Sequence, residues 1–489
     1  MLSITFSNQL PGVLKPLVLG LPKGQGARAY GKFLDQQAID AIDKLIDRGV
    51  FKEKAGETLC LYAFSGFEKV ILLGLGDAPL EEADAIEVGG KLAASLEKEK
   101  ALDPFMVLHG ADDEVICHVA LGAMLRAWRF DTFKGDKDPT SKEMVIWSDR
   151  ADELQHLLAP KQAVAESVLW SRELVNLPAN VLTPDAMIKE MRALEPLGLV
   201  CEVLDRKQME DLSMGALLGV AQGSDNPPYL GILHYKGGTP GKAPLAFVGK
   251  GVTFDSGGLS LKPAGSMPEM KGDMGGSAVV LGVMRSLALM KAPFNAVGVV
   301  ALVENMVSGG AQRPGDIVKS MSGQTIEVLN TDAEGRLILA DALYYTHKTF
   351  SPAVMVDVAT LTGAMRYALG PEYAGLFTPC DKMAAHLTKS GNTVGEKLWR
   401  LPLCEAFKKA MESPVADLQN ISGSGYGAGS STAAQFLKCF VGDTPWAHLD
   451  IANVDMVNKD TPLATRGGSA FGIRLLCRWA LEHAQTLSA

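Results

Sequence analysis

Short apolar runs alternate with amphipathic stretches through the first 150 residues. The runs VILLGLG at 70–76, FMVLHG at 105–110 and EMVIWS at 143–148 have the length and apolar character of β-strands. Between the first two, EEADAIEVGGKLAASLEKE at 81–99 has the pattern of a helix. This alternation predicts a small α/β domain.

Beyond Pro184 the alternation becomes more regular. Strongly apolar runs such as LAFVG at 245–249, NAVGVVALVE at 295–304 and AVMVDVA at 353–359 are separated by helical stretches of about 12 to 16 residues. Apolar strands that alternate with helices indicate a mostly parallel sheet covered by helices on both faces. Such sheets bind ligands beyond the carboxyl ends of their strands, so we expect the active site at that edge.

A long helical pattern separates the two regions. Val164, Val168, Ser171 and Val175 share one face of it, and Pro178 ends it. With 489 residues the chain is too long for one ordinary core. We therefore predict an N-terminal α/β domain at 1–158, a linker helix at 159–177 and a catalytic C-terminal domain at 178–489.

Charged residues gather in two clusters that follow apolar runs. We expect the first strand to stop at Gly249, where Lys250 begins the series Lys250, Asp255, Lys262, Lys271 and Asp273. The second cluster follows the expected strand TIEVL at 325–329 and contains Asp332, Glu334 and Arg336. Two loops from one sheet edge would bring these groups together.

Four neighbouring carboxylates would repel one another unless cations hold them. Divalent metals take carboxylate oxygens, and an even number of carboxylates suits a two-metal site. Single charged residues in loops are usually just solvated. The set as a whole favours a site, because Gly257, Gly258, Gly272, Gly275 and Gly276 allow a close approach of the backbone to a ligand.

Composition narrows the possible functions. The net charge is −9 and no run of five basic residues occurs, which argues against a dedicated nucleic-acid surface. The N-terminus lacks a basic region and no apolar run is long enough to span a bilayer, so we expect no signal peptide and no membrane contact. Seven cysteines without a CxxC pair indicate reduced thiols in a cytoplasmic protein. The eight histidines form no HExxH or HxH pair, so we expect any metal to be held mainly by carboxylates.

The octapeptide NTDAEGRL at 330–337 resembles the signature of the leucyl aminopeptidase family of cytosolic metallopeptidases. The resemblance extends to VGKGVTFDSGGLSLKP at 248–263, MKGDMGG at 270–276, VNLPANVLTP at 175–184 and ATLTGA at 359–364. It covers most of residues 165–480, whereas the first 150 residues are similar only in general character.

The resemblance implies two divalent ions per subunit, Mn²⁺ or Zn²⁺, joined by carboxylates and a hydroxide. Asp255 and Glu334 would be the shared ligands. Asp332 would complete one ion, and Asp273 with Lys250 the other. A lysine ligand must be neutral, and burial beside a dication would lower its pKa.

The resemblance also implies how peptides are cleaved. An ion would hold the free α-amino group, so that only the N-terminal residue is removed. Lys262 would stabilise the oxyanion, and Arg336 would hold a bicarbonate ion that acts as general base. The family's side-chain pocket corresponds to Met270, Thr360, Gly363 and Ala452, which suits leucine or methionine. Asp455 is unexpected near this pocket, and it leaves the preferred side chain open.

Members of the family form hexamers of two stacked trimers, so a cytoplasmic homohexamer acting on peptides is expected. Two other classes stay open. A two-metal phosphoesterase would use the same carboxylates but usually adds histidine ligands, and neither cluster contains one. Some bacterial relatives also bind DNA, but no basic stripe indicates such a role here.

Overall fold

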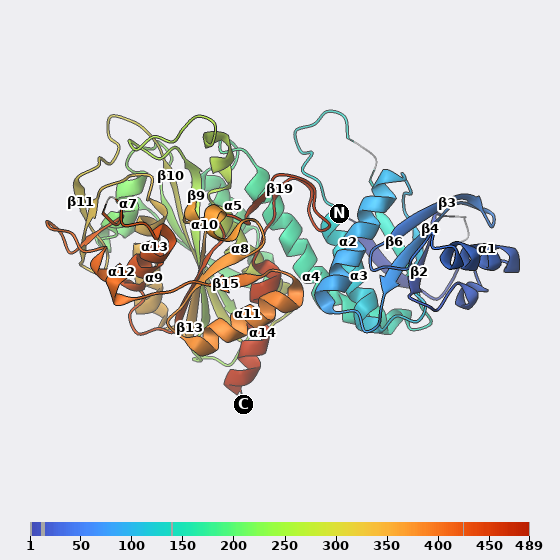
Figure 1. Ribbon diagram of the computed structural model, residues 1–489. Helices are drawn as coiled ribbons and strands as arrows, with labels where there is room; N and C mark the ends of the chain where they lie inside the picture. Colours follow the sequence, from blue (N-terminus) through green and yellow to red (C-terminus); the bar gives the residue numbers. More distant parts are fainter. Residues whose placement is uncertain (1, 11–14, 138–139, 424, 489) are drawn as a thin grey trace. The chain divides into compact units, whose positions relative to one another are not determined.

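The computed structural model describes residues 2–10, 15–137, 140–423 and 425–488, and its chain divides into two compact units (Figure 1). The first unit comprises Met1–Leu169, Thr393–Gly395 and Asn458–Arg466, and the second comprises Trp170–Asn392, Glu396–Val457 and Gly467–Ala489. The helix predicted at 159–177 corresponds to α4 (Ala151–Asn176), which begins eight residues earlier and includes Pro160. The change of unit falls within this helix.

The first unit is built on a six-stranded sheet with the order β1-β6-β5-β2-β4-β3. Only the pairing of β3 with β4 is antiparallel among its described strands. The strands expected at 70–76, 105–110 and 143–148 are confirmed as β4, β5 and β6. The strands are β1 (Ser3–Ser7), β2 (Leu17–Pro22), β3 (Thr58–Phe64), β4 (Phe67–Gly76), β5 (Phe105–Val107) and β6 (Glu143–Trp147).

This unit also contains the first part of α4 and four further elements, α1 (Gln36–Asp47), α2 (Glu82–Lys98), α3 (Asp113–Arg126) and the short η1 (Arg28–Tyr30). Helices α2 and α3 touch through glycines. A Cβ atom on Gly89 would lie 1.9 Å from the carbonyl oxygen of Val119, and one on Gly122 would lie 1.8 Å from that of Ile86. The two backbones therefore pack at a distance that no side chain at these positions permits.

The second unit contains an eight-stranded sheet with the order β15-β14-β17-β13-β9-β10-β8-β7. Its centre, β17-β13-β9-β10, is parallel, while β8 pairs antiparallel with β7 and β10, and β14 pairs antiparallel with β17. The strands are β7 (Leu199–Leu204), β8 (Tyr229–Lys236), β9 (Leu245–Asp255), β10 (Asn295–Asn305), β13 (Val354–Ala359), β14 (Ala374–Phe377), β15 (Leu398–Arg400) and β17 (Trp446–Asp450).

Helices lie on both faces of this sheet (Figure 1), so the predicted α/β class with a mostly parallel sheet in the larger unit is confirmed. The helices are α5 (Pro184–Arg192), α6 (Arg206–Asp211), α7 (Gly215–Ala221), α8 (Gly275–Leu289), α9 (Gly335–Phe350), α10 (Ala364–Leu369), α11 (Asp381–Val394), α12 (Glu405–Lys409), α13 (Gly429–Lys438) and α14 (Ile473–Ser488). Short 3₁₀ turns occupy η2 (Glu195–Leu197) and η3 (Met267–Gly272).

Two expectations about the strands were wrong. The strand predicted to stop at Gly249 continues to Asp255, because β9 keeps its pairing with β10 up to Asp255 opposite Asn305. The strand expected at 325–329 is β12 (Thr325–Val328), but it lies outside the large sheet. It pairs with β11 (Asp316–Lys319) and β16 (Leu418–Gln419) in a separate three-stranded sheet. A further two-stranded sheet joins β18 (Met456–Val457) to β19 (Gly467–Gly468).

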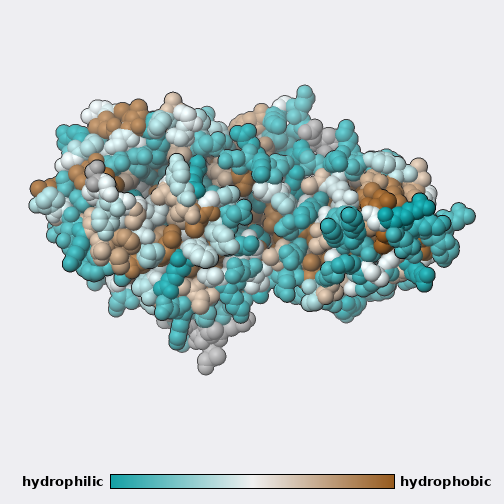
Figure 2. Space-filling model, viewed as in Figure 1, coloured by the Kyte–Doolittle hydropathy of each residue, from teal (hydrophilic) through white to brown (hydrophobic). Residues whose placement is uncertain are grey.

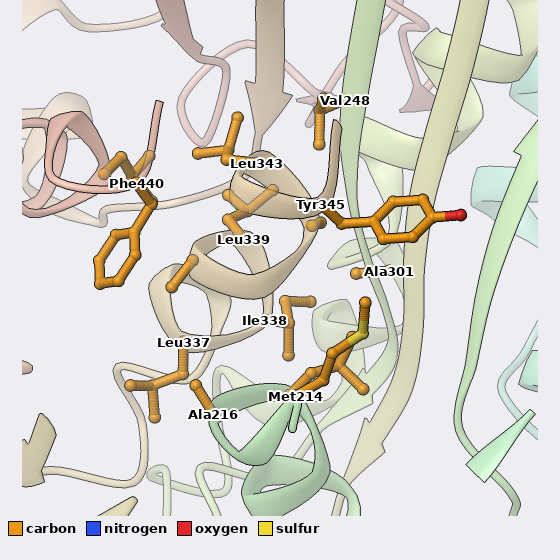
Figure 3. Packing of buried hydrophobic residues seen from close by; sticks show 14 of the residues in the cluster. Met214, Ala216, Val248, Ala301, Leu337, Ile338, Leu339, Leu343, Tyr345 and Phe440 are labelled. Atoms are coloured by element: carbon orange, nitrogen blue, oxygen red, sulfur yellow. The ribbon is translucent and has the colours of Figure 1, made fainter. Parts of the chain in front are cut away.

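Helix α9 is buried along most of its length. Its Leu337, Ile338, Leu339 and Leu343 belong to a core cluster that also includes Val248 of β9 (Figure 3). On the face shown in Figure 2, hydrophilic residues predominate and apolar residues form small patches. Within the described residues, no helix combines the length and apolar character needed to cross a bilayer.

Candidate active site

Three carboxylates meet beyond the carboxyl end of β9. Asp255 ends that strand, Asp273 follows η3, and Glu334 stands immediately before α9. All three are buried, and each offers an oxygen within 4.8 Å of those of the other two. The two charged clusters therefore do converge, although the second one follows a strand of the separate small sheet.

Glycines bring the backbone close to these groups. Gly257 has a φ of 86°, and a Cβ atom there would lie 2.8 Å from Asp332 Oδ1. Gly335 does not have a left-handed backbone conformation, but a Cβ atom added there would lie 2.7 Å from Cε of Lys250. A side chain at either position would occupy the space that the charged groups need.

Lys250 lies inside β9 and is buried among the carboxylates. Its Nζ atom donates to Asp273 Oδ1 at 2.7 Å and to the carbonyl oxygen of Thr360 at 2.9 Å, and it lies 2.8 Å from Glu334 Oε1. Burial acts to lower the pKa of Lys250, but the charges of Asp273, Glu334 and Asp255 outweigh it and raise the pKa. Without metal ions, Lys250 is thus an ammonium counterion, and a role as neutral ligand requires cations to reverse the shift.

Lys262 joins the fourth carboxylate to the cluster. Its Nζ atom lies 2.8 Å from Asp255 Oδ2 and 2.5 Å from Asp332 Oδ1. Burial lowers its pKa, but the charges of Asp255 and Glu334 and its hydrogen bonds raise it overall. The structure therefore brings all four predicted carboxylates and both lysines into one network.

The chemistry of this network fits divalent cations. Burial raises the pKa of Asp255, Asp273 and Asp332, so the protein holds these charges at a cost in free energy. Glu334 Oε2 is buried and has no hydrogen-bond partner in the described part of the chain. A buried carboxylate oxygen without a donor is an open ligand position for a hard metal ion.

Two neighbouring side chains orient the carboxylates, a role that the sequence did not predict for either of them. Asn305, at the end of β10, donates from Nδ2 to Asp255 Oδ1 at 2.8 Å. The hydroxyl of Thr360, which the sequence placed only in the substrate pocket, donates to Asp273 Oδ1 at 2.7 Å. Asn305 could have been found from its register, because it stands directly opposite Asp255 in the parallel pair β9–β10.

Arg336 lies apart from the pocket lining. Its Nη1 atom donates to the carbonyl oxygen of Asn420 at 2.7 Å, and its Nε atom is buried without a partner among the described residues. Burial lowers the pKa of Arg336 to about 10, opposed by the charges of Glu334 and Asp450. Asn420, which the sequence analysis missed, also donates to the carbonyl oxygen of Asn330 at 2.6 Å.

A pocket of about 380 Å³ opens beside the network. It contains all five expected metal ligands and Lys262, and the four expected pocket residues also line it. The lining comprises Lys250, Asp255, Lys262, Pro263, Ser266, Glu269, Met270, Gly272, Asp273, Asp332, Glu334, Thr360, Leu361, Gly363, Arg366, Tyr367, Ala452, Asp455 and Met456. The expected metal ligands and Lys262 thus line the same cavity as two methionines, Met270 and Met456.

Comparison with known proteins gives two matches to family models. Residues 169–477 match the catalytic domain of the cytosol aminopeptidase family, and residues 18–137 match its N-terminal domain. Curated relatives include a probable cytosol aminopeptidase of Allorhizobium ampelinum, 49% identical over 94% of each chain. Another, from Wolbachia pipientis, is 45% identical over 97% of this chain and 95% of the relative.

Solved structures include a similar enzyme described as the bottromycin maturation enzyme BotP in complex with Mn. It superposes with a TM-score of 0.84 at 32% identity, and the match covers 96% of this chain and all of that one. A second structure of BotP gives a TM-score of 0.83 with the same coverage.

Proposed function

Because the chain belongs to the cytosol aminopeptidase family and is therefore a metal-dependent aminopeptidase, we propose that it removes leucine, methionine and similar residues from the N-terminus of peptides. The observation that carries the proposal is the buried convergence of Asp255, Asp273 and Glu334 at one end of a substrate-sized pocket. The catalytic domain is assigned to 178–489, the linker helix to 159–177 and the N-terminal domain to 1–158.

Two divalent ions would be held by five residues. Asp255 and Glu334 would serve both ions, Asp332 would complete one, and Asp273 with Lys250 would complete the other. The partnerless Oε2 of Glu334 and the crowding of carboxylate oxygens support this assignment. Such ions would activate a water molecule as the nucleophile and would polarise the scissile carbonyl. Manganese or zinc is proposed, and the complex of BotP with Mn supports manganese.

Lys262 and Arg336 are proposed as the catalytic side chains. The Nζ atom of Lys262 lies in the pocket lining next to the carboxylates, where it can stabilise the oxyanion that forms on the scissile carbonyl. Arg336 is proposed to hold a bicarbonate ion as general base. The buried Nε atom without a partner supports an anion site there.

Met270, Thr360, Gly363 and Ala452 are proposed to receive the side chain of the N-terminal residue. All four line the pocket that contains the carboxylates. A flexible thioether beside small residues adapts to unbranched and branched aliphatic side chains. We further propose a cytoplasmic homohexamer, which light scattering would detect as a particle six times the mass of one chain.

The test is hydrolysis of leucine-p-nitroanilide by chelator-stripped protein, with and without added Mn²⁺ or Zn²⁺. We expect metal-dependent cleavage, two ions per chain by elemental analysis, and no cleavage of the N-acetylated substrate. The double variant Asp332→Asn, Glu334→Gln should lose both metal and activity. Two bound ions without cleavage of any free-amine substrate would refute the proposal and favour a phosphoesterase.

A further inference from the structure

The side-chain wall of the pocket contains an acidic residue. Asp455 lines the pocket together with Met270 and Met456. A methyl group added to Gly272 would lie 3.7 Å from Asp455 Oδ2, and one added to Gly275 would lie 4.0 Å from it. The carboxylate of Asp455 therefore stands beside the backbone of the segment that also presents Met270.

This carboxylate is buried and has no paired cation among the described residues. Only 9% of Asp455 is exposed, and burial raises its pKa to about 7. The charge of Arg366 and the backbone N–H groups of Met456 and Asp455 lower that pKa in part. Arg366 is exposed, donates from Nε to the carbonyl oxygen of Ala452 at 3.3 Å, and forms no ion pair with Asp455 in the described part of the chain.

A buried carboxylate without a cation is costly, and nothing in the packing of an aliphatic substrate would require it. Leucine or methionine would cover the carboxylate with apolar atoms and remove what hydration it has. Lysine or arginine would instead lay its apolar stem along Met270 and Met456 and bring its charge to Asp455. The combination of an apolar wall with one acid thus matches a long side chain that ends in a cation.

We propose that Asp455 determines specificity by binding the ammonium or guanidinium group of an N-terminal lysine or arginine. The proposal rests on the proposed aminopeptidase function and extends its substrate class from aliphatic to basic N-terminal residues. Asp455 touches only the substrate side chain, so it changes selectivity and leaves the hydrolytic chemistry as it is.

The test compares kcat/KM for the p-nitroanilides of lysine and methionine, whose side chains have similar lengths. In the manganese-loaded wild-type enzyme the lysine-to-methionine ratio is set by Asp455. Asp455→Asn keeps the size of the side chain but removes its charge, and we expect the ratio to fall at least about tenfold. A ratio that stays within about twofold of wild type would overturn the proposal.

Two further variants test the effect of a nearby charge and control for net charge. Arg366→Gln retains Asp455 but removes a competing positive charge, so the ratio should rise. Glu372→Gln changes the net charge equally at an exposed position outside the pocket lining, and its ratio should equal that of wild type. A fall of equal size in Glu372→Gln would assign the effect to the overall field of the protein and refute a local role.

A measurement on the wild-type enzyme alone completes the test. Free lysine should inhibit methionine-p-nitroanilide hydrolysis more strongly than norleucine, its uncharged analogue of equal chain length. Equal inhibition would contradict the proposal even if Asp455→Asn failed to fold. A different result would refute the proposed function itself: the enzyme would then cleave no substrate with a free amino group. In that case the proposed role of Asp455 would be refuted as well.

Discussion

Gly276 should be the most sensitive of the glycines around the site. It is the second residue of α8, and a Cβ atom there would lie 2.1 Å from the carbonyl oxygen of Val358 in β13 and 3.0 Å from the backbone nitrogen of Lys250 in β9. Both neighbours are backbone atoms of central strands, so neither can rotate away. Gly276→Ala must push α8 off the sheet, and overpacking of this kind costs about 1–3 kcal/mol.

Gly275→Ala is the matched control, one residue earlier in the same helix. Its Cβ atom would meet nothing closer than the methyl group of Thr360 at 3.4 Å. We expect its thermal midpoint to stay near that of wild type, while Gly276→Ala should melt lower by about 1–2 °C for each kcal/mol lost. Scanning fluorimetry or calorimetry at one metal concentration measures both.

Gly276→Ala should also reduce activity, because the displaced strand carries Lys250. A shift of about 1 Å at a catalytic group can cost about 10²-fold in rate. Equal midpoints for the two alanine variants would refute this reasoning. They would mean that α8 moves away from β13 without cost and that Gly276 is not required by close packing.

Three further predictions follow from the charged groups. Lys262→Met should lower kcat for leucine-p-nitroanilide by about 10²–10³-fold with little change in KM, because a group that stabilises the oxyanion acts in the transition state. A rise in KM with unchanged kcat would contradict this role. Mn²⁺ at 100 times its Kd should stabilise chelator-stripped protein by about 2.7 kcal/mol for each site that it fills, measured by denaturant unfolding. No stabilisation would exclude a folded-state site. Burial lowers the pKa of His448, but Asp357, 2.6 Å from Nδ1, outweighs it and raises that pKa. The stability that this ion pair contributes is therefore fully present below the pKa of His448 in the unfolded chain, and it is lost as pH rises through the pKa of His448 in the folded protein. Asp357→Asn should thus lower the free energy of unfolding more at pH 5.5 than at pH 9. An equal loss of stability at both pH values would show that His448 stays neutral.

Local patterns were sufficient to predict the strands at 70–76, 105–110 and 143–148 and the convergence of the two charged clusters, although the second cluster does not follow a strand of the large sheet. The end of β9 was misjudged for a physical reason. A charge after an apolar run usually marks the end of a buried strand. Lys250 is buried inside the strand because Asp273 and Glu334 compensate its charge, and both lie far from it along the chain.

The pairing of β12 could not be predicted from its own residues. TIEV has the apolar alternation of many strands, and only its contacts with β11 and β16 separate it from the large sheet. The roles of Asn305 and Asn420 could not be predicted for a similar reason, because each side chain or carbonyl group contacts a segment that is distant in sequence. What a local pattern lacks is information about which partner satisfies each polar group.

The balance of charge in the network explains why the site suits divalent ions. Four carboxylates face two ammonium groups, so the metal-free network keeps an excess of negative charge in a buried place. Burial raises the pKa of Asp255, Asp273 and Asp332, and the neighbouring carboxylates raise each of these pKa values further. A monovalent cation would relieve only part of it, whereas two dications overcompensate it and favour the neutral form of Lys250. In the proposed two-ion site, Lys250 would be an internal counterion without metal and a nitrogen ligand with it. Metal binding would then release a proton and should strengthen as pH rises.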